Sequence, residues 1–163
     1  MADTLRDADK VVADILQADM DLAADHVRLG NQAGILPPDT GLFVVVFMRP
    51  GPTIGQSSEL DASTNPPREV QTLTNLYNVT IDVMSLYPGQ DARTRLPDVY
   101  MALQGMTAQR AMSEHQMQIG RAQPAVDLSE TDGATRLLRY QISVNVTVLH
   151  LSLIHISEPT RPY

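Results

Sequence analysis

The sequence predicts an α+β fold in which a mostly antiparallel sheet of about four to five strands carries two main helices on one face. Two segments, residues 77–87 and 138–148, alternate apolar and polar side chains with the period of a half-buried strand. Two others, residues 3–18 and 91–106, repeat apolar side chains at helical spacing. Because each strand has one apolar face, we expect the helices to cover that face and solvent to cover the other.

The first predicted helix carries Leu5, Val12 and Ile15 on one face. A short strand is expected at residues 26–29. The run FVVVFM at residues 43–48 predicts a buried strand, because β-branched and aromatic residues favour extended structure. Glycine and tandem proline between these two strands predict a loop.

Residues 49–68 predict an exposed loop or a mobile arm. The segment reads RPGPTIGQSSELDASTNPPR and holds four of the eleven prolines with many small polar residues. A loop of about twenty residues is unusually long for a compact domain, where such loops are usually functional or disordered. The strand that follows could begin as early as Glu69.

The second predicted helix contains Pro97, which either lies in its first turn or kinks it. A further helical piece is expected at residues 108–116, a short strand at 117–122, and a polar turn, DLSETDG, at 127–133. We find no internal repeat. The chain is therefore predicted to hold one domain, residues 1–150.

The charge of the chain excludes some classes of partner. The net charge is −7, Lys10 is the single lysine, and the arginines are scattered. No run of arginines could neutralise a row of phosphates, so we expect no sequence-specific nucleic-acid partner. No apolar stretch approaches the roughly 18 residues of a membrane span, so no membrane partner is expected. The N-terminus lacks the basic-then-apolar layout of a signal peptide.

The sequence offers little chemistry. The chain has no cysteine, and His26, His115 and His150 lack the spacing that puts two imidazoles on one helix face for a metal. His115 follows a serine and a glutamate, but triads are assembled from distant segments. The carboxylates of residues 127–133 lack the EF-hand pattern. We therefore predict no catalytic, cofactor-binding or metal-binding residue, no cofactor, and no enzymatic activity.

Several of the eight methionines cluster around the second predicted helix, namely Met101, Met106, Met112 and Met117. Methionine is flexible and polarizable, so it fills irregular gaps in cores and adapts to partners at interfaces. Core filling and a subunit interface both remain open.

The segment from Leu151 to Tyr163 reads LSLIHISEPTRPY. Most of it resembles one reading frame of a common sequencing-library adapter translated into protein. We interpret residues 151–163 as an artefactual tail, produced by read-through into vector-like sequence. The native chain is then expected to be cut near His150, and the histidine and glutamate of the tail carry no function.

Three blocks of the chain follow one another in a distinctive order. The first is HVRLGNQ at residues 26–32, followed by LPP and the strand FVVV. The second is the strand at residues 76–87, which ends in YPG and leads to a helix opening at Asp91. The third is an acidic loop at Asp127 and a last strand through RYQI at residues 139–142. In order and spacing these blocks resemble the family of tailed-phage neck and tail-terminator proteins.

The resemblance implies a tail-terminator-like α+β fold and a structural virion protein. Family members form a ring, often a hexamer, that caps the tail tube and joins it to the head. The implied partners are other copies of the chain, tail-tube proteins and head-completion proteins, assembled in the bacterial host cytoplasm. A ring requires a heterologous interface, and residues 49–68 are the segment we expect to reach a neighbour.

Two other functions remain open from the sequence. One is a different virion component, either another head-tail connector or a part of the baseplate. The other is a cytosolic ligand-binding or regulatory α+β domain, which would be a monomer or dimer with a closed and partly apolar pocket.

Overall fold

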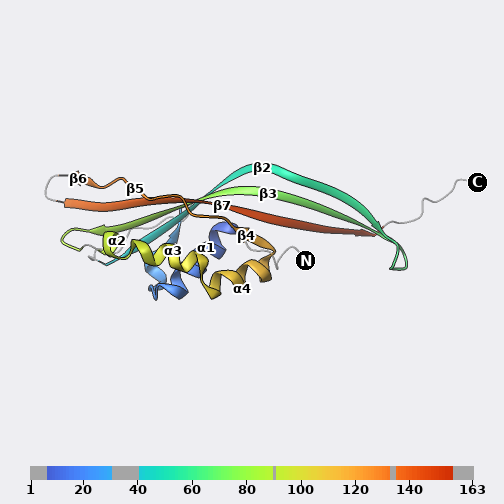
Figure 1. The fold of residues 1–163 in the computed structure, drawn as a ribbon, viewed down its shortest axis with the longest axis horizontal. Coiled ribbons are helices and arrows are strands. Elements are labelled where there is room, and N and C mark those ends of the chain that lie inside the picture. The colour runs from blue at the N-terminus through green and yellow to red at the C-terminus, as the bar shows by residue number, and fades with distance from the viewer. Residues whose placement is uncertain (1–6, 31–40, 90, 133–134, 156–163) are drawn as a thin grey trace, which may run out of the picture.

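The computed structural model describes residues 7–30, 41–89, 91–132 and 135–155, which form one sheet with helices packed on one face (Figure 1). The sheet is antiparallel except for one short strand, in the order β1-β2-β3-β7-β4. The predicted α+β class is therefore confirmed. The described sheet has seven strands, more than the four to five predicted, because several short strands add to its edges.

Three long strands make up most of the sheet: β2 (Phe43–Asp61), β3 (Arg68–Leu86) and β7 (Thr135–His155). Each contains 19 to 21 residues, whereas about 5–6 is usual. The strand β3 lies between the other two and pairs antiparallel with both along nearly its whole length. The three predicted main strands are confirmed. The strands β2 and β7 extend beyond their predicted ends, and β3 begins within one residue of Glu69, the earliest start predicted for it.

The short strands lie along the two edges of this ribbon: β1 (Val27–Leu29), β4 (Met117–Ile119), β5 (Val126–Asp127) and β6 (Glu130–Asp132). The strand β1 is parallel to β2, and the other three pair along the outer edge of β7. The predicted strand at residues 26–29 is confirmed as β1, and the strand predicted at 117–122 is confirmed for residues 117–119. The prediction of a plain polar turn at 127–133 is wrong for its described part, because β7 supplies pairing partners for β5 and β6.

The helices are α1 (Ala8–Asp19), α2 (Asp91–Thr94), α3 (Leu96–Gln104) and α4 (Met106–His115), with one 3-10 turn, η2 (Ala24–His26). Asp7 has extended backbone angles, so α1 begins later than the predicted residue 3, and residues 3–6 lie outside the described part. The predicted helix at 91–106 is split. Pro97 stands in the first turn of α3, where its missing N–H costs no helical hydrogen bond. None of the described helices is long and apolar enough to span a bilayer.

The apolar core lies between the helices and the face of the sheet that they cover. Ile81 and Val83 of β3 and Ile142 and Val146 of β7 are fully buried on this face, as the period-two pattern predicts. Val12 of α1 and other helical residues pack against them. Burial of this continuous apolar surface is what fixes the helices to the sheet.

The opposite face is not wholly in solvent, and this corrects the expectation for Asp82. Its carboxylate is only 2% exposed. The guanidinium Nη2 of Arg139 donates to Oδ2 of Asp82 over 2.8 Å, and Nε2 of Gln141 donates to Oδ1 over 3.0 Å. Both donors come from β7, directly beside the carboxylate. The buried charge is tolerated because it is paired and hydrogen-bonded.

We predict that Ile142→Ala lowers the free energy of unfolding by about 3 kcal/mol, because it removes a fully buried side chain from the middle of the core. Ile54→Ala is the matched control, since Ile54 is 56% exposed. It should change stability by no more than about 0.5 kcal/mol. Urea unfolding followed by circular dichroism measures both. Equal effects at the two positions would contradict the assigned core.

Candidate functional site: the projecting arm

The segment predicted as a loop is mostly strand. The strand β2 continues to Asp61, a tight connection follows, and β3 begins at Arg68. Register shifts between Pro50 and Thr53 and between Thr53 and Gly55 accommodate the prolines as bulges. The strand β2 pairs with β1 only at its beginning. Its outer edge here has no described partner, and an edge strand tolerates proline. The prediction of a loop is therefore wrong, whereas the alternative prediction of an arm agrees with the exposed position of this segment.

We define the arm as residues 49–61 of β2, 68–76 of β3 and 149–155 of β7. In Figure 1 these residues form a three-stranded ribbon that extends away from the helices, and within the described ranges no helix lies over either of its faces. The same three strands thus have a helix-covered half and a bare half. The bare half is the most unusual feature of the molecule, because a sheet normally buries one face.

The sequence contains one indication of the arm, which is outweighed by the loop-like composition of residues 49–68. A strand starting near Glu69 was predicted as an option, and β3 does begin at Arg68. A strand that long requires neighbours for its backbone groups along its whole length. Residues 53–61 are the nearest chain available to supply them, and they do so in β2.

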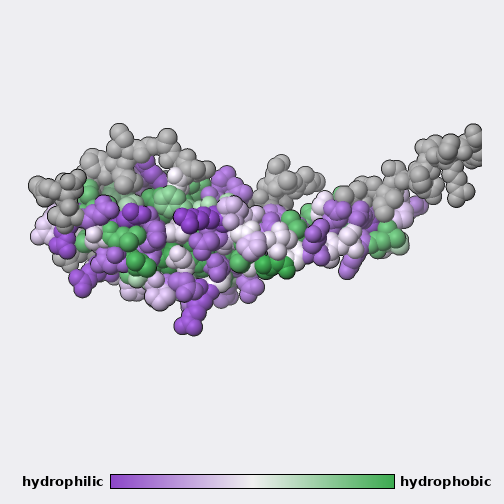
Figure 2. Space-filling model, turned by 90° about the horizontal axis from the view of Figure 1, so that it is seen from above, coloured by the Kyte–Doolittle hydropathy of each residue, from purple (hydrophilic) through white to green (hydrophobic). Residues whose placement is uncertain are grey.

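The arm exposes apolar side chains among many hydroxyl and amide groups. Its exposed large apolar residues are Ile54 and Leu60 of β2, together with Leu151 and Leu153 of β7, which belong to the segment interpreted as an artefactual tail. Figure 2 shows the arm as a narrow projection in which hydrophobic residues are interspersed with hydrophilic ones. Such a surface has apolar area to bury but no large contiguous apolar patch. This composition suits contact with another folded chain.

Part of the arm belongs to the segment interpreted as an artefactual tail. Residues 151–155 continue β7 and pair with Arg68–Thr72 of β3. An open sheet edge accepts any segment that can form a strand. The pairing therefore does not bear on the origin of residues 151–163, and residues 156–163 lie outside the described part.

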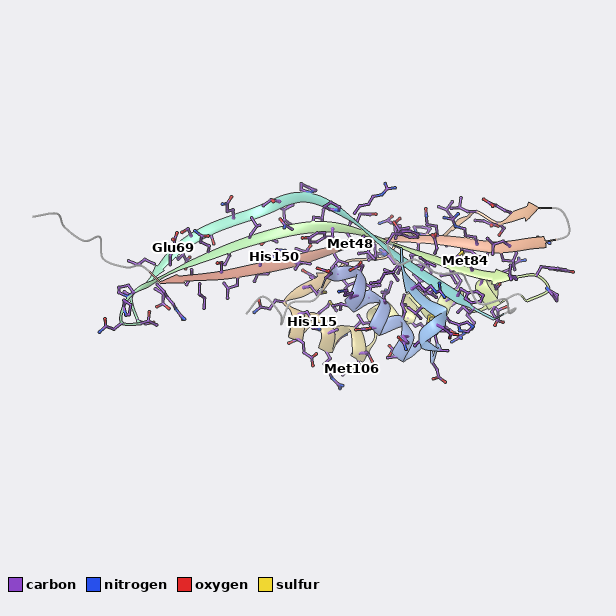
Figure 3. The ribbon with its side chains drawn as sticks, turned by 180° about the vertical axis from the view of Figure 1, so that it is seen from behind. Met48, Glu69, Met84, Met106, His115 and His150 are labelled. Atoms are coloured by element: carbon purple, nitrogen blue, oxygen red, sulfur yellow. The ribbon has the colours of Figure 1, made fainter. Side chains whose placement is uncertain are left out.

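A chain of polar contacts crosses all three strands where the arm leaves the helix-covered half. The hydroxyl of Thr53 donates to Oδ1 of Asn75 over 2.9 Å. The Nδ2 group of Asn75 donates to the Tyr77 hydroxyl over 3.4 Å, and that hydroxyl lies 3.4 Å from Nε2 of His150. In Figure 3 His150 marks this position on β7. These contacts tie the base of the arm together without an apolar core.

The tip of the arm is held by charged hydrogen bonds. Ser63 donates to Oδ1 of Asp61 through both its hydroxyl, over 2.5 Å, and its backbone N–H, over 3.0 Å. Nε of Arg68 donates to Oδ2 of Asp61 over 2.9 Å. The Ser63 hydroxyl, followed by the Arg68 guanidinium, lowers the pKa of Asp61 from its usual 3.8 to about 2. The carboxylate of Asp61 is therefore ionised at neutral pH and closes the hairpin.

The histidines considered in the sequence analysis lie on separate elements. His26 stacks on Phe43 with ring centroids 4.8 Å apart, and its Nδ1 lies 2.8 Å from Oδ1 of Asp25. His115 ends α4, and His150 lies at the base of the arm. Among the described residues, no three metal-ligating side chains are gathered in one place.

The methionines divide between the two interpretations left open. Met117 is buried, and Sδ of half-buried Met112 accepts a hydrogen bond from the backbone N–H of Ile119 over 3.2 Å. Met101 and Met106 are 63% and 74% exposed, and Figure 3 shows Met106 on the outer side of the helical layer. Core filling is confirmed for Met117. The exposed pair remains available for an interface.

No family model matches the chain, and no curated protein is significantly similar to it. The resemblance to tailed-phage neck and tail-terminator proteins therefore stays a prediction.

The pKa of Asp61 yields a test of the arm tip. Because folding lowers this pKa, the stabilisation by the carboxylate is fully present above about pH 3.8 and is lost as the pH falls toward about 2. We expect an NMR titration of the Asp61 carboxyl to have its midpoint near 2, and Ser63→Ala to raise it. Ser57→Ala is the control, since the Ser57 hydroxyl contacts Thr72 instead. A wild-type midpoint near 3.8 would contradict the described tip.

Proposed function

We propose that this chain is a structural subunit that assembles with copies of itself into a ring. In the specific form of the proposal, the ring is the tail terminator or neck of a tailed-phage virion. It would cap the tail tube and join it to the head, with tail-tube and head-completion proteins as its other partners. Assembly would take place in the bacterial host cytoplasm, and the mature location would be the virion.

The arm is the single observation that carries the assembly part of the proposal. Its three strands extend beyond the helices with bare faces, and the outer edge of β2 has no described partner beyond β1. Strand pairs without a packed face are marginally stable in water, and open edges invite pairing with another chain. A partner that covered the arm would supply the burial that the subunit alone does not provide.

The virion part of the proposal rests on the sequence resemblance. Its three blocks contribute neighbouring parts of one sheet. The segment VRL forms β1 beside β2, the second block forms the inner half of β3, and RYQI pairs with β3 through β7. Blocks that were recognised only by their order in the chain are therefore adjacent in space, which supports treating them as one unit.

Native mass spectrometry and negative-stain imaging of the full chain test the proposal. We expect species at one common multiple of the 17.9 kDa subunit mass and particles with a central hole. A chain that remains monomeric at every concentration would refute self-assembly.

A shortened-arm variant tests whether the arm carries the assembly. Replacing residues 54–74 with Asn-Gly joins Thr53 to Asn75, which are paired in the sheet, through a two-residue hairpin turn. We expect this variant to keep the helical circular dichroism signal and to remain a monomer. Undiminished assembly would show that a different surface forms the ring.

A further inference from the structure

The end of the sheet opposite the arm carries a pocket. It has a volume of about 530 Å³ and lies where β3 ends, beside α2 and β5. Tyr87 and Tyr140 contribute aromatic rings to its lining, Arg93 and Arg136 contribute guanidinium groups, and Asp127 contributes the one carboxylate. Neither the sequence patterns nor the arm accounts for this grouping of side chains from four separate segments.

The pocket is locally cationic on an acidic protein. Its lining holds two arginines and one aspartate, a net charge of +1, whereas the whole chain has −7. The Asp127 carboxylate already accepts a hydrogen bond from the backbone N–H of Ser129 over 2.9 Å. Among the described residues, Arg93 and Arg136 form no ion pair. The Arg136 guanidinium carbon lies 5.9 Å from the centroid of the Tyr87 ring. After the Ser129 hydrogen bonds, attraction to Arg136 and Arg93 also lowers the pKa of Asp127. One carboxylate faces two guanidinium groups, so the pocket keeps a positive charge that favours a second carboxylate as ligand.

The tip of the arm has the complementary chemistry. Between residues 59 and 69 the chain carries three carboxylates and one guanidinium, a net charge of −2. Asp61 and Arg68 pair with each other, which leaves Glu59 and Glu69 to supply negative charge. Glu59 is exposed, and so are the two prolines of the turn at residues 66–67. Their rings offer apolar surface that can be buried against aromatic side chains.

We infer that the arm tip of one subunit docks into the pocket at the opposite end of the next subunit, and that this contact links the subunits head to tail. The inference rests on the proposed function, because it specifies the interface of that assembly. Glu59 would reach Arg93 and Arg136, while the prolines of the turn would pack on Tyr87 and Tyr140.

The positions of the two surfaces make the contact intermolecular. Figure 1 shows the tip and the pocket-bearing end at opposite ends of the molecule, and in Figure 3 the labels of Glu69 and Met84 mark the same two ends. The extended ribbon separates its own tip from its own pocket, so the tip can meet only the pocket of another subunit. A contact between two different patches is heterologous, and it generates a ring when the rotation that it repeats closes on itself.

Reciprocal charge reversal tests the inference. The pocket variant is Arg93→Glu with Arg136→Glu, and the arm variant is Glu59→Arg with Glu69→Arg. In either variant alone, like charges meet at every contact, so we expect the concentration needed for half-assembly to rise at least about tenfold. A one-to-one mixture should assemble again if the two variants alternate around the ring. The acidic arm of the pocket variant then meets the basic pocket of the arm variant, and the basic arm of the arm variant meets the acidic pocket of the pocket variant.

Two matched controls lie on α4, away from both surfaces. Arg110→Glu and Glu114→Arg make the same two kinds of substitution, one per variant, at exposed positions and should assemble like the unmodified chain. Circular dichroism establishes that each variant is folded. Single variants that assemble normally, or a mixture that stays dissociated, would overturn the inference while leaving the proposed ring intact. A wild-type chain that never assembles would refute the proposed function itself.

A cross-linking experiment tests the same contact by the proximity of the two surfaces, without reversing any charge. The chain has no cysteine, so Glu59→Cys together with Arg136→Cys places the only two thiols at the tip and in the pocket. Mild oxidation should produce disulfide-linked dimers and longer ladders on a non-reducing gel. Oxidation of Glu59→Cys paired with Arg110→Cys is the control. Equal ladders from both pairs would overturn the inference, because they would reflect random collision.

Discussion

The pairing of β3 with β2 and β7 is the constraint on which the rest of the structure depends. It holds three strands of 19 to 21 residues in one antiparallel register. The buried face fixes that register, because a slip by one residue would turn Ile81 and Ile142 outward and bring polar neighbours into the core. This register also sets the length of the arm and the position of the pocket, because the arm and the pocket lie at opposite ends of these same strands.

The two halves of the ribbon are stabilised in different ways. Toward the pocket, residues 81–85 of β3 are buried on both faces, by the helices on one side and by pairs such as Asp82 with Arg139 on the other. In the arm, hydrogen bonds between strands and polar contacts such as Asn75 with Tyr77 hold the strands without a core. The pocket is therefore presented by a rigid element, whereas the arm has the lower local stability expected of a segment that gains order on contact.

This division suits head-to-tail assembly. The pocket lies at the helix-covered end of the ribbon and holds two guanidinium groups, Arg93 and Arg136, against one carboxylate, Asp127. A ribbon fixed only at its base can bend slightly to meet the angle that closure demands. Electrostatic attraction between the acidic tip and the cationic pocket would select this contact over others on a chain whose overall charge is repulsive.

The sequence by itself determined the fold class, the inner halves of the three long strands, the helices and the break at Pro97, because these depend on local periodicity and on the missing N–H of proline. Tertiary structure decided the rest. Residues 53–61 have the composition of a loop, and they form a strand because β3 offers them an edge. Asp82 is buried because Arg139 and Gln141 reach it from β7. The pocket gathers Tyr87, Arg93 and Arg136 from segments with no common pattern, so only the folded sheet could bring them together.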